Sequence, residues 1–247
     1  MRQWKHNERS AEPEVFDEKV RAVCECYAEA QQLHEEGVYL ISTDEKTGIQ
    51  ALERLHPAVL MQPGKRSCER QEYEYKRHGT RCLIANFEVA TGRIIAPSIG
   101  ETRTNEDFAS HIEKTIATDP DAGWIFVVDQ LNIHQSEALV KLIAGELGIE
   151  LELDSKGNLK HIKAMASRRT FLADPTHRIR FVYTPKYTSW LNQIELWFSI
   201  LVRRLLRRGS FPSVEDLSQR ILAFIEYFNR TMAKPFKWTY QGRPLKV

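Results

Sequence analysis

The sequence predicts an α/β fold: a mixed sheet, partly antiparallel and partly parallel, with helices on both faces. Three strand-like segments follow one another before any helix intervenes, which predicts an antiparallel meander. Short apolar runs then alternate with helical patterns, which predicts further strands joined by right-handed crossovers. The chain has 247 residues, of which 42% are hydrophobic, enough for a sizeable core.

The chain begins with a polar linker and one expected helix. Apolar residues recur at helical spacing from Glu14 to Glu36, and Gly37 suits the position just past a helix end. The continuous apolar run 38–43 is typical of a buried strand, and it ends at Asp44. We therefore expect residues 1–37 to form the linker and helix, and residues 38–247 to form the main domain.

The meander follows a longer irregular stretch. Residues 48–70 contain Pro and Gly and predict a long excursion. Alternating polarity and β-branched residues predict the meander strands at 71–78, 80–90 and 93–99, with turns at Gly79 and Gly92.

Helices and strands alternate in the second half. Thr104 and Asp107 form a capping-box pattern that predicts a helix after them. The apolar run 124–129 predicts a strand covered on both faces. The remaining expected elements are helices at 136–147, 165–173, 188–207 and 213–230, and strands at 149–153 and 179–184.

Composition excludes several classes of protein. The mean hydropathy is −0.43, and the apolar run 124–128 is far shorter than the ~20 residues that a membrane helix needs. The first ten residues lack the apolar core of a secretory signal. Four cysteines without a C-x-x-C pair predict reduced cytosolic thiols rather than a disulfide framework or a zinc site.

Positive charge is concentrated in one part of a chain whose net charge is only +2. Residues 156–208 contain twelve Lys and Arg side chains and two acidic ones. Such a segment can neutralise phosphates and release counterions, although a solvated basic face would have the same composition. Within it, residues 154–178 predict a basic insertion.

Three carboxylates occupy unusual positions. Asp44 and Asp129 each end an apolar strand, and ligand crevices of α/β folds open at such ends, although a turn or a helix cap also places acids there. Glu195 borders the apolar stripe of the helix expected at 188–207, where an unpaired carboxylate is costly. Pairing with a neighbouring Arg is the alternative to a bound cation.

Convergence of the three acids would suit one chemistry. Divalent cations such as Mg²⁺ take carboxylate oxygens as ligands, and two such ions can assist an in-line displacement at a phosphodiester. Nearby Lys and Arg would hold the polyanion. The sequence also lacks a Walker-type phosphate loop and a Gly-x-Ser-x-Gly motif, so it supports neither nucleotide hydrolysis nor an esterase.

Three segments of the chain resemble one family. They are YTSWLNQIELWFSIL at 187–201, ISTDEKTGIQALER at 41–54 and IFVVDQLNIHQS at 125–136. Together they are similar to the DDE transposases of the mariner superfamily, in particular the bacterial insertion-sequence branch of the IS-six-thirty type. The likeness extends over about residues 14–245, including the tail AKPFKWTYQGRPL at 233–245.

The resemblance implies a ribonuclease H-like fold and a metal-dependent enzyme. Asp44, Asp129 and Glu195 would be the catalytic triad and would bind Mg²⁺ or Mn²⁺, with two ions expected. The activity would be cleavage of DNA at transposon ends, followed by transfer of the freed 3′-hydroxyl into target DNA. Double-stranded DNA would be the partner of a homodimer located in the bacterial cytoplasm with the nucleoid.

Further residues are candidates around this triad. His134 and Asn192 are expected to support the carboxylates, although a loop-capping histidine explains His134 equally well. Trp190 and Trp197 are expected to serve in packing more than in base stacking. The candidate DNA-binding residues are Lys160, Lys163, Arg168, Arg169, Lys186, Arg203 and Arg207.

The sequence departs from the family pattern in three places. Thr188 replaces a usual Ser, and Gln130 stands where many relatives have Asn. The N-terminal helix-turn-helix region of these enzymes is missing before Glu14, so we expect a catalytic part that partners with a DNA-recognition half.

Three alternatives remain open. The chain could be another ribonuclease H-like nuclease, or a catalytically idle DNA-binding or regulatory remnant of a transposase. A paired-carboxylate glycosidase would require neither a metal nor basic residues around the site.

Overall fold

A computed structural model of the chain describes residues 13–56, 64 and 74–240. Its sheet has the strand order β3-β2-β1-β4-β5. Strands β1, β2 and β3 form the antiparallel part, and β4 and β5 continue the sheet parallel to β1. The strands are β1 (Val38–Arg54), β2 (Tyr75–Glu88), β3 (Ile94–Gly100), β4 (Gly123–Val128) and β5 (Ile179–Tyr183). The predicted mixed sheet is confirmed.

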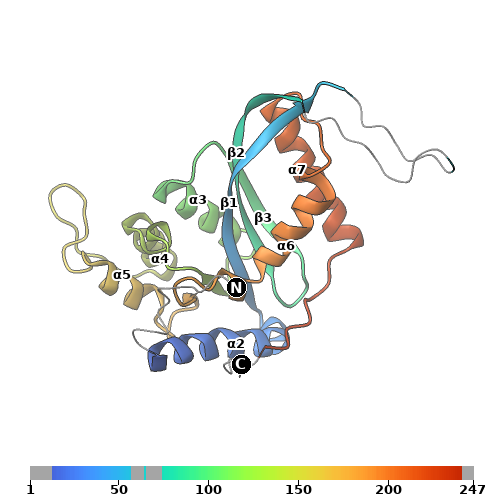
Figure 1. Cartoon of the computed structure of the whole chain (residues 1–247). Helices are drawn as coiled ribbons and strands as arrows, with labels where there is room; N and C mark the ends of the chain where they lie inside the picture. Colours follow the sequence, from blue (N-terminus) through green and yellow to red (C-terminus); the bar gives the residue numbers. More distant parts are fainter. Residues whose placement is uncertain (1–12, 57–63, 65–73, 241–247) are drawn as a thin grey trace.

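Helices cover both faces of this sheet (Figure 1). Helices α2, α6 and α7 contribute to the core on one face, and α3, α4 and α5 to the core on the other. The helices are α2 (Pro13–Glu35), α3 (Asn105–Ile116), α4 (Glu137–Leu147), α5 (Met165–Leu172), α6 (Ile194–Leu201) and α7 (Val214–Thr231). Short 3₁₀ helices η1 (Asn132–Gln135) and η2 (Ser189–Leu191) lie in the loops, and the π-helical segment η3 (Val202–Leu206) continues α6.

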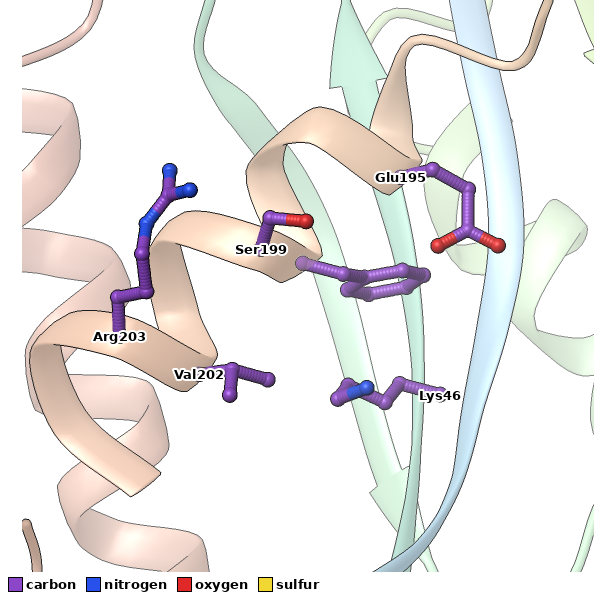
Figure 2. Close-up of a pocket in the computed structure, with 6 residues that line it drawn as sticks. Lys46, Glu195, Ser199, Val202 and Arg203 are labelled. Atoms are coloured by element: carbon purple, nitrogen blue, oxygen red, sulfur yellow. The ribbon is translucent and has the colours of Figure 1, made fainter. Parts of the chain in front are cut away.

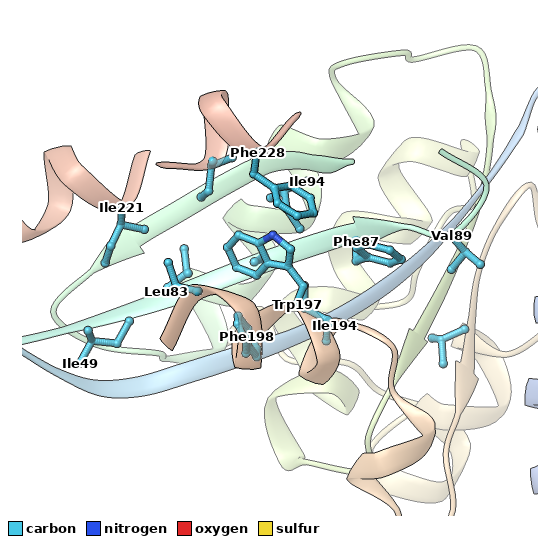
Figure 3. Close-up of a cluster of buried hydrophobic side chains, with 14 of the residues drawn as sticks. Ile49, Leu83, Phe87, Val89, Ile94, Ile194, Trp197, Phe198, Ile221 and Phe228 are labelled. Atoms are coloured by element: carbon cyan, nitrogen blue, oxygen red, sulfur yellow. The ribbon is translucent and has the colours of Figure 1, made fainter. Parts of the chain in front are cut away.

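The two cores follow from the alternation of side chains along the central strands. In β4, Ile125 and Val127 face α6 and α7, whereas Trp124, Phe126 and Val128 face α3 and α4. A strand that is buried on both faces needs apolar residues at every position, and this explains the continuous apolar run. Figure 3 shows part of the first core, where α6 packs its apolar side chains on the sheet.

Several helix boundaries agree with the sequence. Thr104 and Asp107 form the predicted reciprocal capping box at the start of α3, and Ser213 caps α7 through the Asp216 N–H. Gly148 ends α4 in the left-handed conformation with φ of +67°, which glycine adopts without steric cost. Helix α2 ends one residue earlier than expected.

Two strands are longer than the sequence predicted. The strand expected at 38–43 continues to Arg54, so Asp44 lies inside β1 rather than at its end. Gly79, expected at a turn, lies inside the single strand β2 with φ of +129°. Antiparallel pairing of β1 with β2 extends both strands beyond the apolar run, which the periodicity alone could not show. Most of the excursion expected up to residue 70 lies outside the described residues.

Two further expectations about elements were wrong. Residues 149–153 form no strand, and only an isolated bridge joins Leu153 to Leu159. The helix expected from 188 begins instead at Ile194, because Thr188 and Asn192 use their side chains to bond the backbone elsewhere. Such local and tertiary hydrogen bonds compete with helix formation.

The basic segment 154–178 is part of the second core rather than a loose appendage. Leu159 and Leu172 are completely buried in that core, and α5 packs against α4, η1 and β5. Arg169 on α5 donates to the side-chain oxygen of Gln130 over 3.4 Å. The insertion therefore reaches the residue that follows Asp129.

The described C-terminal residues pack on the face of the sheet that α2, α6 and α7 cover. Phe236 stacks on Phe87 with ring centroids 4.6 Å apart, and Trp238 packs edge-on against Tyr27 at 5.0 Å. The backbone of Lys234 passes so close to Gly92 that a Cβ there would lie 2.0 Å from the Lys234 carbonyl oxygen. Glycine is thus required at this turn both for its φ of +74° and for the close approach.

No helix in the described part of the chain combines the length and apolar character needed to cross a bilayer. Among the described residues, Cys24, Cys26 and Cys82 are not joined in disulfide bonds.

Candidate active site

The register of β1 and β4 brings Asp44 and Asp129 to the same level of the sheet. The parallel pairing runs from Val38 opposite Gly123 to Ser42 opposite Val127. Asp44 and Asp129 each lie two residues beyond that last pair, at the carboxyl ends of the paired segments. Their proximity is electrostatically significant, since the Asp129 charge contributes to a raised pKa at Asp44.

Alternation along β1 sends successive side chains to opposite faces. Ser42, Asp44 and Lys46 face α6, whereas Thr43 and Glu45 face α3 and η1. Thr43 donates to buried Asn86, which in turn donates to Thr115 on α3. The strand is therefore fixed from both sides where it carries Asp44.

Asn192 connects the start of α6 to β1. Its amide nitrogen donates to the Thr43 carbonyl oxygen at 2.9 Å and to an Asp44 carboxylate oxygen at 3.4 Å. Ser42 donates to the Asn192 amide oxygen, and the Ile194 N–H donates to the Ser42 hydroxyl at 2.9 Å. These buried bonds set the position of α6 relative to Asp44.

Glu195 lies in the first turn of α6, next to this junction. It is half-buried and lines a pocket of about 220 Å³. In Figure 2 its carboxylate points from α6 toward β1, and Arg203 lies farther along α6–η3. The pocket is lined by Lys46, Glu195, Phe198, Ser199, Val202 and Arg203.

On the opposite face, His134 joins two carboxylates. Its Nδ1 lies 2.8 Å from an Asp129 carboxylate oxygen, and its Nε2 lies 2.9 Å from a Glu45 carboxylate oxygen. The side chains of His134 and Glu45 are completely buried, and Arg103 approaches Glu45 at 3.5 Å. His134 is thus a bridge that holds Asp129 in one orientation.

The electrostatics of these groups are strongly perturbed. Burial raises the pKa of Asp44 to about 7, and the Glu45 and Asp129 charges add to the rise, while the Glu45 N–H and His134 oppose it. Burial alone would lower the pKa of His134, but its bonds to Asp129 and Glu45 raise the pKa to about 10. Burial alone would raise the pKa of Asp129, but the hydrogen bond to His134 and the charge of His134 lower it below its ordinary value.

The residues present suit a divalent cation, although the three acids do not already form a ligand cage. Among the described residues, no group of three or more His, Cys, Asp and Glu side chains is arranged to hold a metal ion. Yet the half-buried Asp44 carboxyl has a pKa of about 7 beside further acids, so negative charge accumulates where a cation would neutralise it. Carboxylate oxygens are also the donors that Mg²⁺ and Mn²⁺ prefer.

The basic residues proposed from the sequence divide into two groups. Arg169 contacts Gln130, Arg203 shares the pocket of Glu195, and exposed Lys186 lies in the loop that leads to α6. Lys160 instead lies 3.9 Å from Glu152 in the insertion. Lys163 and Arg207 are exposed, and Arg168 is half-buried in α5.

Sequence reasoning missed Glu45 as part of the site. It directly follows Asp44, and its partner His134 is 89 positions away in the chain. Alternation in a strand would have placed Glu45 on the face opposite Asp44, but nothing in the sequence indicates which histidine lies there. Ser42, which bonds both Asn192 and Ile194, was missed for the same reason.

Two solved structures share the fold of this chain. The chain is similar to a structure of the Mos1 mariner paired-end complex with Mn, with a TM-score of 0.53, 13% identity and coverage of 92% of this chain and 58% of that one. It is also similar to the catalytic domain of Mos1 mariner transposase, with a TM-score of 0.52, 12% identity and coverage of 92% and 85%. At such low identity the likeness shows the fold, which is that of this ribonuclease H-like catalytic domain.

The chain spans 58% of the Mos1 chains in the paired-end complex and in the pre-cleavage transpososome. No curated protein sequence matches it. The family described as DDE superfamily endonuclease matches residues 39–218, which include Asp44, Asp129 and Glu195. Since that match covers most of the chain, the protein belongs to the DDE superfamily endonucleases.

Proposed function

We propose that the chain is the catalytic domain of a DNA transposase of the bacterial insertion-sequence branch. It would cleave DNA strands at transposon ends and join the freed 3′-hydroxyl to target DNA, in a reaction that depends on a divalent metal. Family membership supports the endonuclease chemistry, and the Mos1 structures with the same fold are transposase complexes.

One observation carries the proposal. Strand register brings Asp44 and Asp129 together, and the Asn192 bonds fix the start of α6, with Glu195, against the same strand. The three acids come from segments separated by 84 and 65 intervening residues, so only the fold could bring them to one region. We assign Asp44, Asp129 and Glu195 as the metal-binding catalytic residues.

The surrounding residues have separate tasks in this proposal. One or two Mg²⁺ or Mn²⁺ ions held by the three acids would supply charge stabilisation at the scissile phosphate and activation of the attacking oxygen. His134 orients the Asp129 carboxylate and leaves it ionised. Asn192 orients Asp44, and Arg169, Lys186 and Arg203 bind DNA phosphates on either side.

The partners follow from the same assignment. Double-stranded DNA is the substrate, both as transposon end and as target. We propose that the chain acts as a dimer or together with a DNA-recognition half, because the Mos1 chains that share its fold act in paired-end complexes and are considerably longer than this chain.

A plasmid-nicking assay tests the proposal. Supercoiled DNA is incubated with Mn²⁺ or Mg²⁺ and with wild type, Asp44→Asn, Asp129→Asn or Glu195→Gln. Each substitution should reduce nicking by about 100-fold or more, since the loss of a metal ligand removes several kcal/mol of transition-state stabilisation. Glu226→Gln, at an exposed acid on α7, is the matched control and should nick like wild type.

Equal nicking by wild type and Glu195→Gln would contradict the proposal and favour a catalytically idle remnant. Nicking that persists in EDTA would equally contradict the metal dependence. A strand-transfer assay with a pre-cut transposon end then separates a transposase from another nuclease of this fold.

A further inference from the structure

The loop between β5 and α6 presents two aromatic side chains to solvent. Tyr187 is 70% exposed and Trp190 is 51% exposed. Large aromatic residues supply much of the burial energy of a protein, and the neighbouring Trp197 is completely buried in the core. Two large aromatics exposed within four residues make this loop a candidate binding surface.

Hydrogen bonds and a buried leucine fix this loop to the body of the protein. Buried Thr188 donates through its hydroxyl to the Pro185 carbonyl oxygen at 2.6 Å. Leu191 is completely buried against residues of α2, and the Tyr27 hydroxyl donates to the Leu191 carbonyl oxygen at 2.9 Å. Tyr187 has φ of +62°, a strained conformation that surrounding contacts must maintain and that is frequent at functional sites.

The same loop lies between the two catalytic aspartates. At its beginning, the Thr184 N–H donates to the Val128 carbonyl oxygen, and the Gln130 side chain donates to the Thr184 carbonyl oxygen, both at 2.9 Å. Asp129 stands between Val128 and Gln130. At the end of the loop, Asn192 donates to Asp44. DNA held at the acids would therefore lie next to the aromatic loop.

The chemistry of the loop favours a nucleobase as the occupant. Exposed Lys186 precedes Tyr187 and carries a charge complementary to phosphate. Trp190 meets Tyr240 edge-on, with centroids 5.2 Å apart and an interplanar angle of 76°, so that contact uses the edge of one ring. Aromatic side chains together with a cation are the usual means of binding unpaired bases.

A protein partner fits this surface less well. Two aromatic side chains bury about 150–250 Å² each, whereas a stable interface buries about 800 Å² on each partner. The polyanion already expected at the adjacent carboxylates gives a base a direct route to the loop.

We propose that Tyr187 and Trp190 form a stacking platform for bases unpaired from the duplex beside the phosphodiester that is cleaved. This inference rests on the proposed function, because it places DNA at Asp44 and Asp129. The platform would hold the duplex locally open and so fix the scissile strand.

Binding measured in EDTA tests the platform without catalysis. Two fluorescent duplexes of equal length are compared, one fully paired and one with a short mismatched bubble that contains 2-aminopurine. Wild type should bind the bubble more tightly and quench the 2-aminopurine. Trp190→Ala and Tyr187→Ala should each reduce bubble affinity by about 10-fold and leave affinity for the paired duplex unchanged.

Matched variants make the result specific. Trp190→Phe should retain much of the bubble preference and the quenching, because it keeps an aromatic face. Tyr227→Ala removes an exposed tyrosine of α7 and should bind both duplexes like wild type. Equal affinity of wild type for both duplexes would overturn the platform, as would an equal effect of Trp190→Ala on both.

A protein-docking role has its own signature. If Trp190→Ala changes the oligomeric state in sedimentation without changing bubble binding, the loop is an interface between copies and the platform is wrong. Failure of the platform leaves the nicking difference between wild type and Glu195→Gln intact, so it is distinguishable from failure of the proposed function.

Discussion

Asp44 is partly buried next to other negative charges, and this creates an energetic conflict in the metal-free chain. Its folded-state pKa of about 7 lies above the ordinary value of 3.8. For an acid with a raised pKa, the ionised form destabilises the fold, so the stability contributed by the protonated form is lost as the pH rises from about 4 to 7. The cation that we propose for this site would relieve the conflict.

Asp44→Asn should therefore raise the melting temperature of the metal-free protein at pH 8. We expect an increase of a few degrees, since ~1 kcal/mol shifts the melting temperature of a chain of this size by about 2–4 °C. The difference should vanish near pH 4, and the variant should lose the stabilisation that Mn²⁺ gives to wild type. Thermal denaturation in EDTA and in Mn²⁺ measures both effects, and a variant less stable than wild type at pH 8 would contradict this account.

The Glu45–His134 pair is the second prediction at the scale of single residues. Both side chains are completely buried, so removing one partner leaves the other poorly compensated. His134→Gln should lower the free energy of unfolding by about 1–3 kcal/mol. The double variant Glu45→Gln/His134→Gln should lose less than the sum of the single variants in urea denaturation. Simple additivity would show that the two groups do not interact.

At the scale of elements, the packing of α3 requires that its buried histidine, His111, stay uncharged. His111 is completely buried, its Nδ1 lies 2.9 Å from the Ser98 hydroxyl, and burial together with the Lys114 charge lowers its pKa to about 3. A histidine with a depressed pKa contributes its full stability above the unfolded pKa of about 6.5, and that stability is lost as the pH falls toward 3.

His111→Gln should flatten this dependence. Over that pH range the wild type should lose up to about 1.4 kcal/mol of unfolding free energy per pH unit through His111, and the variant should lack this contribution. His161→Gln is the control, because the His161 side chain is 76% exposed. Identical pH profiles for His111→Gln and wild type in urea titrations would exclude the effect.

Helix α6 is stabilised by packing rather than by its length of 8 residues. Trp197 is completely buried between α6 and the sheet, and its ring meets Phe228 of α7 edge-on at 6.0 Å. Trp197→Ala should cost about 3–5 kcal/mol of unfolding free energy. Trp190→Ala should cost at most about 0.5 kcal/mol, because Trp190 lies at the surface. Chemical denaturation of the two variants compares them directly, and similar losses would refute this division.

At the scale of the whole molecule, we expect the distribution of charge to decide how the proposed DNA substrate is held. The insertion packs into the second core and places α5 beside the residue after Asp129. Arg168→Glu/Arg169→Glu should therefore weaken DNA binding and flatten its dependence on salt, by about 0.9 in the logarithmic slope for each DNA phosphate that the protein no longer neutralises. Binding titrations at several salt concentrations measure the slope.

The control for this prediction lies on α7. Arg220→Glu/Arg230→Glu makes the same change of charge at exposed positions outside the candidate active site. An unchanged slope for the α5 variant, or an equal change in both variants, would remove the insertion from the DNA-binding surface.

Much of the fold could be predicted because it depends on local patterns. The apolar run of β4, the capping box before α3 and Gly148 after α4 each specify an element within a few residues. The prediction failed where pairing partners decide the outcome, as in the extension of β1 to Arg54 and the late start of α6. Asp44 and Asp129 were identified as neighbours because both follow apolar strand segments.

The sequence by itself determined the mixed sheet, most of its helices and the apolar strand segments that precede Asp44 and Asp129, since helical and strand periodicities are properties of short segments. Tertiary structure decided which side chains meet. Ser42 bonds Asn192 across 150 positions, and Glu45 meets His134 across 89. The exposure of Trp190 and the burial of Trp197 were decided in the same way, because a side chain is buried only where another element of the fold packs against it.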